Sequence, residues 1–174
     1  ILGALKTSNL TSLLTDLTMK IQKNHPEILD ELARDIKALD AIRNCLEDIK
    51  EMTSNSTKNV QNENKYLGPL LLLFCIASRD NSPPLFSNFE KKENVITSLL
   101  EMRKYTNQRL QIFSALTKNE TFCENVEDST MENIIHLISS STPSRGQHLS
   151  NTALRLILAM STHKKGCLIL EKHD

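Results

Sequence analysis

The sequence predicts an all-α protein made of repeated helical units, and three observations lead to this fold class. Apolar residues recur every three or four positions through most of the chain, which is the period of a helix that buries one face. Residues 110–128 align without a gap with residues 154–172, LQIFSALTKNETFCENVED against LRLILAMSTHKKGCLILEK. The chain has four glycines, two tyrosines and no tryptophan, which argues against a β-sandwich with its many turns and aromatic strands.

The first predicted helix runs from about Ser8 to Asn24. Its apolar residues form one stripe with steps of three and four positions: Leu10, Leu13, Leu14, Leu17 and Ile21. The helix ends at Asn24-His25-Pro26, because the residue before a proline disfavours α geometry.

The second predicted helix is long, from Pro26 or Glu27 to about Met52. Its apolar stripe is spaced like a coiled-coil seam: Ile28, Leu32, Ile36, Leu39, Ile42, Leu46 and Ile49. This stripe either packs along the first helix, which makes residues 1–52 an N-terminal helical hairpin, or pairs with a second chain and gives self-association through the helix 27–52. We favour the hairpin, because the repeats that follow supply a neighbour for it.

Residues 53–65, TSNSTKNVQNENK, are polar and predict an exposed loop. This loop separates the hairpin from a repeat region over residues 66–174. The next helix, at about residues 65–78, is apolar almost all round and is therefore expected to be buried on several sides. The remaining helices are predicted at 84–89, which is short, and near 91–104, 106–118, 129–141, 148–162 and 164–173.

A second short sequence also occurs twice, with a different number of residues between its copies. Glu93-Asn94-Val95-Ile96 matches Glu132-Asn133-Ile134-Ile135 at an offset of 39 residues, whereas the first repeat has an offset of 44. The difference places five extra residues in the loop around 139–148, where insertions are tolerated. The chain ends at Asp174, where the pattern requires its next helix, so we expect a repeat region that is truncated at its C-terminal end.

The run TMENIIHLISSS, followed by LSNTALRLILAMSTHKKGCLILEKHD, resembles an armadillo repeat. That family has a middle helix with paired aliphatic residues, a long third helix with an Ala-Leu-x-x-Leu-type core, and a polar turn into the next short helix. Gly166 occupies the position where the family often has glycine. The resemblance covers about residues 65–174 and implies an armadillo/HEAT-like α-solenoid of about three repeats, on which the N-terminal hairpin packs.

One departure from the family pattern limits what the chain is expected to bind. Peptide-binding armadillo proteins hold an extended peptide with a ladder of asparagines and a nearby tryptophan on the third helix. The asparagine positions hold Ala115 and Ala159, and the tryptophan positions hold Gln111 and Arg155. The methyl side chain of alanine cannot form a hydrogen bond with a peptide backbone. The chain is therefore more similar to the divergent armadillo scaffolds of centrioles, cilia and chromosome axes, of which rotatin-type centriolar proteins are an example.

Enzyme motifs are missing from the sequence. It has no glycine-rich phosphate loop, no GxSxG and no HExxH. We therefore expect no enzymatic activity, no cofactor and no small-molecule substrate.

The cysteines are predicted to be structural. Cys123 and Cys167 hold matched positions in the two aligned segments, and no two of the four cysteines, which include Cys45 and Cys75, form a CxxC pair. Buried positions in the core therefore explain the cysteines better than a disulfide does. The closest set of metal-ligating residue types is His163, Cys167 and His173. The alignment places a turn at 162–165, and the residues that match these histidines in the first copy are not ligands, so no metal is expected.

Charge and composition favour a protein partner. Lys plus Arg equals Asp plus Glu, 21 against 21, and this balance gives no overall field toward a membrane or a nucleic acid. We expect a non-catalytic intracellular scaffold, cytoskeletal at the centrosome or cilium, or nuclear on chromosomes, that binds a helical or acidic segment of another protein. A nucleic-acid-binding helical repeat is the alternative. The predicted contact residues on the concave face are Gln111, Arg109, Lys118 and Arg155.

Overall fold

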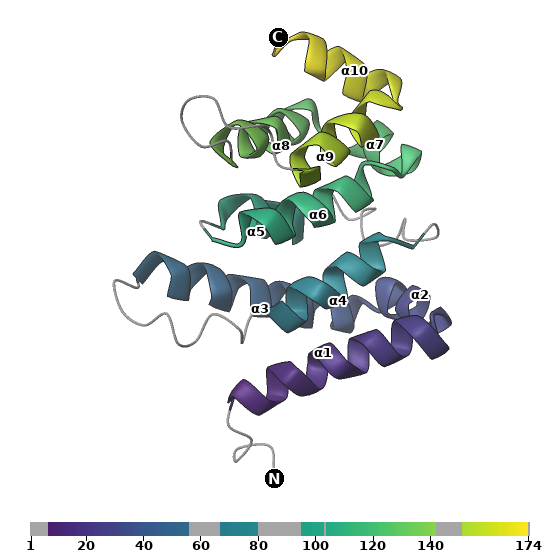
Figure 1. Ribbon diagram of the computed structural model, residues 1–174, viewed down its shortest axis with the longest axis vertical. Helices are drawn as coiled ribbons and strands as arrows, with labels where there is room; N and C mark the ends of the chain where they lie inside the picture. The colour runs from purple at the N-terminus through teal and green to yellow at the C-terminus, as the bar shows by residue number, and fades with distance from the viewer. Residues whose placement is uncertain (1–6, 56–66, 80–94, 103, 142–150, 174) are drawn as a thin grey trace.

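The computed structural model describes residues 7–55, 67–79, 95–102, 104–141 and 151–173, and every regular element in these ranges is an α-helix. The prediction of an all-α chain is therefore confirmed. The helices are α1 (Thr7–Asn24), α2 (Glu27–Arg34), α3 (Ile36–Asn55), α4 (Leu67–Ala77), α5 (Val95–Glu101), α6 (Thr106–Leu116), α7 (Glu120–Asn125), α8 (Asp128–Ser141), α9 (Asn151–Ser161) and α10 (Lys164–Glu171). Figure 1 shows them stacked along the long axis, from α1 at the bottom to α10 at the top.

One row of this stack, termed the first row, consists of α1, α4, α6 and α9, each of which packs against the next. Side-chain hydrogen bonds cross two of these contacts. Cys75 Sγ on α4 donates to Gln22 Oε1 on α1 at 3.3 Å, and Thr152 Oγ1 on α9 donates to Asn107 Oδ1 on α6 at 2.8 Å. Because Asn107 and Thr152 both lie in the first turn of their helices, α6 and α9 begin side by side.

A second row consists of α3, α5, α8 and α10, each of which packs against the next. Ser98 Oγ on α5 donates to Glu47 Oε1 on α3 at 2.6 Å. Lys165 on α10 forms an ion pair of 3.1 Å with Asp128 at the start of α8, and it also donates to the carbonyl oxygen of Val126. Polar contacts between neighbours therefore fix the order of this row as well.

The hydrophobic core runs along the stack, and α6 supplies several of its large, fully buried side chains. Leu110, Ile112, Phe113 and Leu116 on this helix are all at most 1% exposed. α6 packs against α4, α8 and α9, and these contacts bury most of its surface. Each of these side chains contributes roughly 1.5–3 kcal/mol relative to an exposed position.

The prediction of one long helix from residue 26 to residue 52 is wrong, because the chain breaks at Asp35. This residue has an extended backbone, with φ of −84° and ψ of 109°. Its carboxylate Oδ1 accepts a hydrogen bond from the Lys37 backbone N–H at 2.9 Å, which satisfies one of the free donors at the start of α3. The spacing of apolar residues is the same on both sides of Asp35, so the sequence pattern did not reveal the break between the two helices.

Two residues of the predicted stripe lie in the core of the chain. Ile42 and Leu46 are 6% and 0% exposed and belong to the core. α3 packs mainly against α5, whereas α1 packs mainly against α4. Ile42 and Leu46 are thus buried inside the chain, while the N-terminal hairpin and self-association through residues 27–52 stay predictions.

The two aligned segments share local structure after α6 and after α9. Cys123 Sγ donates to the Thr117 carbonyl oxygen at 3.3 Å, and Cys167 Sγ donates to the Ser161 carbonyl oxygen at 3.1 Å. Cys123 is buried and Cys167 is half-buried, and all four cysteines are free thiols. The six-residue helix α7 was missing from the predicted helices, because one and a half turns are too short to show a stripe.

Three predicted segments fall wholly or mostly outside the described residues. They are the polar loop at 53–65, the short helix at 84–89 and the loop expansion at 139–148. Within the described part of the first segment, α3 extends to Asn55. No helix in the described ranges is both long enough and apolar enough to cross a membrane.

Candidate functional site

The outer side of α9 carries large exposed apolar side chains at the C-terminal end of the first row. Leu154 is 48% exposed and Leu158, one turn later, is 67% exposed. Ile157 is half-buried and Ser161 is exposed. These four residues, spaced i, i+3, i+4 and i+7, share one side of the helix and are termed the α9 face.

The corresponding positions on α6 are all buried. Leu110, Phe113, Ser114 and Thr117 are between 0% and 7% exposed. α6 lies between α4 and α9, whereas α9 has only α6 beside it among the described helices of the first row. The positions that are buried on α6 and exposed on α9 are therefore those that face the next helix of the row.

The opposite end of the first row is also apolar. On α1, Leu13, Leu17 and Met19 are 57%, 50% and 52% exposed. Leu13 and Leu17 are one turn apart and share a side of the helix. Both end helices of the row thus present leucines to solvent.

Three of the four predicted contact residues are exposed. Gln111 on α6 and Arg155 on α9 hold matched positions on two packed helices, and Lys118 follows α6. The prediction that Arg109 is exposed is wrong, since this residue is only 4% exposed. Its Nη2 donates to the Leu100 carbonyl oxygen at 2.7 Å.

Sequence reasoning missed the exposed leucines of the α9 face. A signal was present in residues 154–160, LRLILAM, where six of seven residues are apolar. A helix with one buried face needs fewer apolar residues than this. The surplus indicates a helix with neighbours on more than one side.

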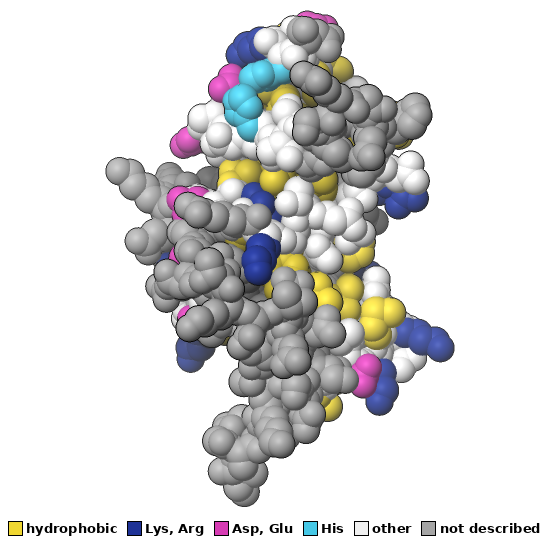
Figure 2. Space-filling view, turned by 60° about the vertical axis from the view of Figure 1, so that its left-hand side comes forward, with side chains coloured by type: hydrophobic (Ala, Val, Ile, Leu, Met, Phe, Trp, Pro, Cys, Tyr) yellow, Lys and Arg dark blue, Asp and Glu magenta, His cyan; other side chains and the backbone are white. Residues whose placement is uncertain are grey.

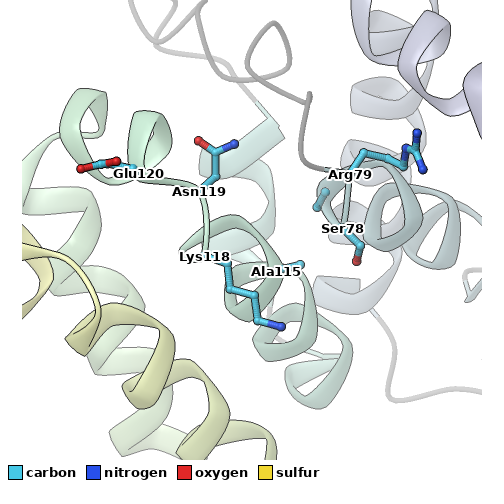
Figure 3. Close-up of a pocket in the computed structure, with 7 residues that line it drawn as sticks. Ser78, Arg79, Ala115, Lys118, Asn119 and Glu120 are labelled. Carbon is cyan, nitrogen blue, oxygen red and sulfur yellow. The ribbon is translucent and has the colours of Figure 1, made fainter.

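A cavity of about 300 Å³ lies between the C-terminal ends of α4 and α6. Figure 3 shows Ser78 and Arg79 on one wall and Ala115, Lys118 and Asn119 on the other. Ala115 contributes only a methyl group to the wall, which offers no hydrogen bond.

Several polar groups of this cavity already serve the fold. Arg79 points away from Ala115 in Figure 3 and forms a two-bond pair with Asp30, with Nε and Nη2 at 2.9 and 2.8 Å from the carboxylate oxygens. This hydrogen bonding holds the pKa of Asp30 below its ordinary value. Asn119 Oδ1 accepts from the Phe122 N–H at 3.2 Å and caps α7. Arg79 and Asn119 therefore already serve contacts within the chain.

The histidines and cysteines near the C-terminal end make structural contacts. Figure 2 shows histidine side chains gathered there, and His136 and His173 meet edge to face with ring centroids 5.6 Å apart. The His163 carbonyl oxygen accepts from the Cys167 N–H at 3.0 Å. Within the residues that the structure describes, no three His, Cys, Asp or Glu side chains are grouped as a metal site would require.

Basic side chains are scattered over the face shown in Figure 2 and do not gather into one patch among the coloured residues. Comparisons with protein-family models, curated proteins and solved structures gave no match for this chain.

Proposed function

We propose that the chain is a non-catalytic protein-binding module, an armadillo-like α-solenoid of about three repeats whose α9 face receives an amphipathic helix from a partner protein. The observation that carries the proposal is the contrast between the α9 face and its buried counterpart on α6. Solenoids bury each unit against the next and use their remaining surfaces for partners. The proposed setting is a larger intracellular assembly of centrosomal, ciliary or chromosome-associated type.

The contact between α6 and α9 supplies the geometry for this binding. The partner helix would lie across Leu154 and Leu158 as α9 lies across Leu110 and Ser114, in a helix-in-groove mode. Burial of two leucines contributes roughly 3–6 kcal/mol before the entropic cost of association is subtracted. Arg155 is exposed beside Leu154 and would pair with an acidic residue at the edge of the partner helix.

Site-specific photocrosslinking in cells tests the proposal. A photoreactive amino acid at Leu158 should form an adduct with one partner segment, identified by mass spectrometry. The same group at Asp40, an exposed residue on α3, serves as control. The adducted segment is then synthesised as a peptide and titrated against the purified chain.

The peptide should gain helical circular dichroism on binding. Leu154→Asp together with Leu158→Asp should weaken binding about a hundredfold, because two buried leucines are replaced by charges. Leu13→Asp together with Leu17→Asp, at the other end of the row, should leave affinity unchanged. Equal adducts at Leu158 and Asp40, or peptide binding that survives the α9 double substitution, would refute the proposal.

A further inference from the structure

Arg109 on α6 is a buried cation with an unused donor. Only 4% of the residue is exposed, and its one hydrogen bond joins Nη2 to the Leu100 carbonyl oxygen. Its Nε is buried and has no hydrogen-bond partner. Burial lowers the pKa of Arg109 to about 10, which leaves the guanidinium protonated at neutral pH.

The repeat itself does not require a cation at this position. Ala153 on α9 is the residue that matches Arg109 in the alignment, and it is 0% exposed. The same slot therefore packs with a methyl group in one copy and a guanidinium in the other. A buried charge without a counter-ion is among the least favourable groups to place in a core, so its presence calls for a partner of opposite charge.

Arg109 lines a cavity of about 650 Å³ between α5, α6 and α8. Leu100, Met102 and Leu137 give this cavity apolar walls, and Asn133 and Ser140 on α8 add hydrogen-bonding groups. The volume is in the range of ligand pockets and admits a side chain rather than a single ion.

We propose that this cavity, the Arg109 cavity, binds the side-chain carboxylate of an acidic segment in a partner protein, which pairs with the guanidinium of Arg109. The inference rests on the proposed protein-binding function but uses a surface separate from the α9 face. Pairing with a carboxylate would supply both the missing hydrogen bond and the missing negative charge.

The charges around the cavity favour a carboxylate over a phosphate. Among the described residues that line it, Arg109 is the one arginine or lysine, and Glu101 and His136 line it too. A group with a single negative charge balances the one guanidinium of Arg109, whereas a phosphate dianion carries a second charge that Arg109 alone does not balance. The methylene groups of an acidic side chain would contact Leu100 and Leu137.

Nitrogen-15 NMR of the arginine Nε–H groups in the whole chain tests this inference directly. The probe is the capped peptide Ac-(Glu)6-NH2, and Ac-(Gln)6-NH2 is the uncharged control. The glutamate peptide should shift the Arg109 Nε–H resonance downfield in a saturable way, and the glutamine peptide should not. Sodium phosphate at the same charge concentration should produce a much smaller shift.

Arg109→Met keeps the length of the side chain and removes its charge, and we expect it to fold and to lose affinity for the glutamate peptide about tenfold or more. Arg155→Gln is the matched control at an exposed arginine and should lose less than about twofold. The α9 double substitution should leave this binding intact, so failure of this inference and failure of the α9 proposal are separable. Binding that persists in Arg109→Met, an equal response to phosphate, or an Nε–H resonance that no probe moves would each overturn the inference.

Discussion

A Cβ atom on Gly166 would lie 2.1 Å from the carbonyl oxygen of Met160, well inside any permitted contact. Met160 lies in the last turn of α9 and Gly166 in the first turn of α10. The absence of a side chain at residue 166 therefore allows α10 to fold back closely on α9.

Gly166→Ala should destabilise the protein by about 2 kcal/mol or more, because backbone rather than a movable side chain must shift. Urea unfolding followed by circular dichroism measures this. Lys164→Ala, an exposed change in the same helix, should alter stability by less than about 0.5 kcal/mol. Equal stabilities for the two variants would show that the close approach is not required.

Leu156 and Leu158 lie on the same helix, α9, so the effect on stability of truncating a buried leucine can be compared with that of truncating an exposed one. Leu156 is 0% exposed and Leu158 is 67% exposed. Leu156→Ala should lower the free energy of unfolding by about 2–5 kcal/mol through lost burial and a cavity, and Leu158→Ala by less than about 0.5 kcal/mol. Thermal or urea unfolding of the isolated chain decides this, and a large loss for Leu158→Ala would mean that the α9 face is already covered.

The pair between Asp30 and Arg79 should make stability depend on acid pH. The hydrogen bonds from Arg79 lower the pKa of Asp30 from 3.8, so the folded state binds this proton less tightly than the unfolded state. The stabilisation is therefore present above about pH 4 and is lost as pH falls through the lowered folded pKa.

Asp30→Asn should accordingly lower stability by about 1 kcal/mol at pH 7. The difference from the unmodified chain should shrink as the pH is taken below 4 in urea titrations. Asp16→Asn, at an exposed residue of α1, supplies the control and should follow the unmodified chain throughout. A difference that stays constant down to pH 2 would exclude the ion pair as its source.

Thiol reactivity should separate Cys123 from Cys45. Burial raises the pKa of Cys123 to about 11, whereas Cys45 is exposed, although burial of its thiol and Asp48 raise its pKa too. At pH 7.5 iodoacetamide should modify Cys45 at least about tenfold faster, because the thiolate is the reactive form and must be reached by solvent. Peptide mass spectrometry over time measures both rates. In urea the two rates should converge, and equal rates in the folded chain would contradict the buried position of Cys123.

Most helices were predictable because their signal is local. Steps of three and four positions between apolar residues marked α1, an almost wholly apolar run marked α4, and a proline marked the end of α1. The break at Asp35 left this step unchanged, since it depends on one carboxylate that bonds the Lys37 N–H. α7 was missed because six residues carry no periodicity.

The candidate sites were only partly predictable. Gln111, Lys118 and Arg155 were expected to be exposed and are exposed. Arg109 is charged but buried, and its burial could not be predicted from the residue type. The alignment held a hint in Ala153, since an apolar residue in one copy indicates an inward position in the other.

The sequence by itself determined that this chain is helical and that two of its segments are matched, because period and alignment are properties of residue order. Only the tertiary structure decided that matched positions differ in exposure. Leu110 and Leu154 are the same residue type at aligned positions of the sequence, at 1% and 48% exposure. The difference arises because burial depends on a neighbouring helix. α6 has α9 as its next neighbour in the row, and the described residues contain no such helix beyond α9.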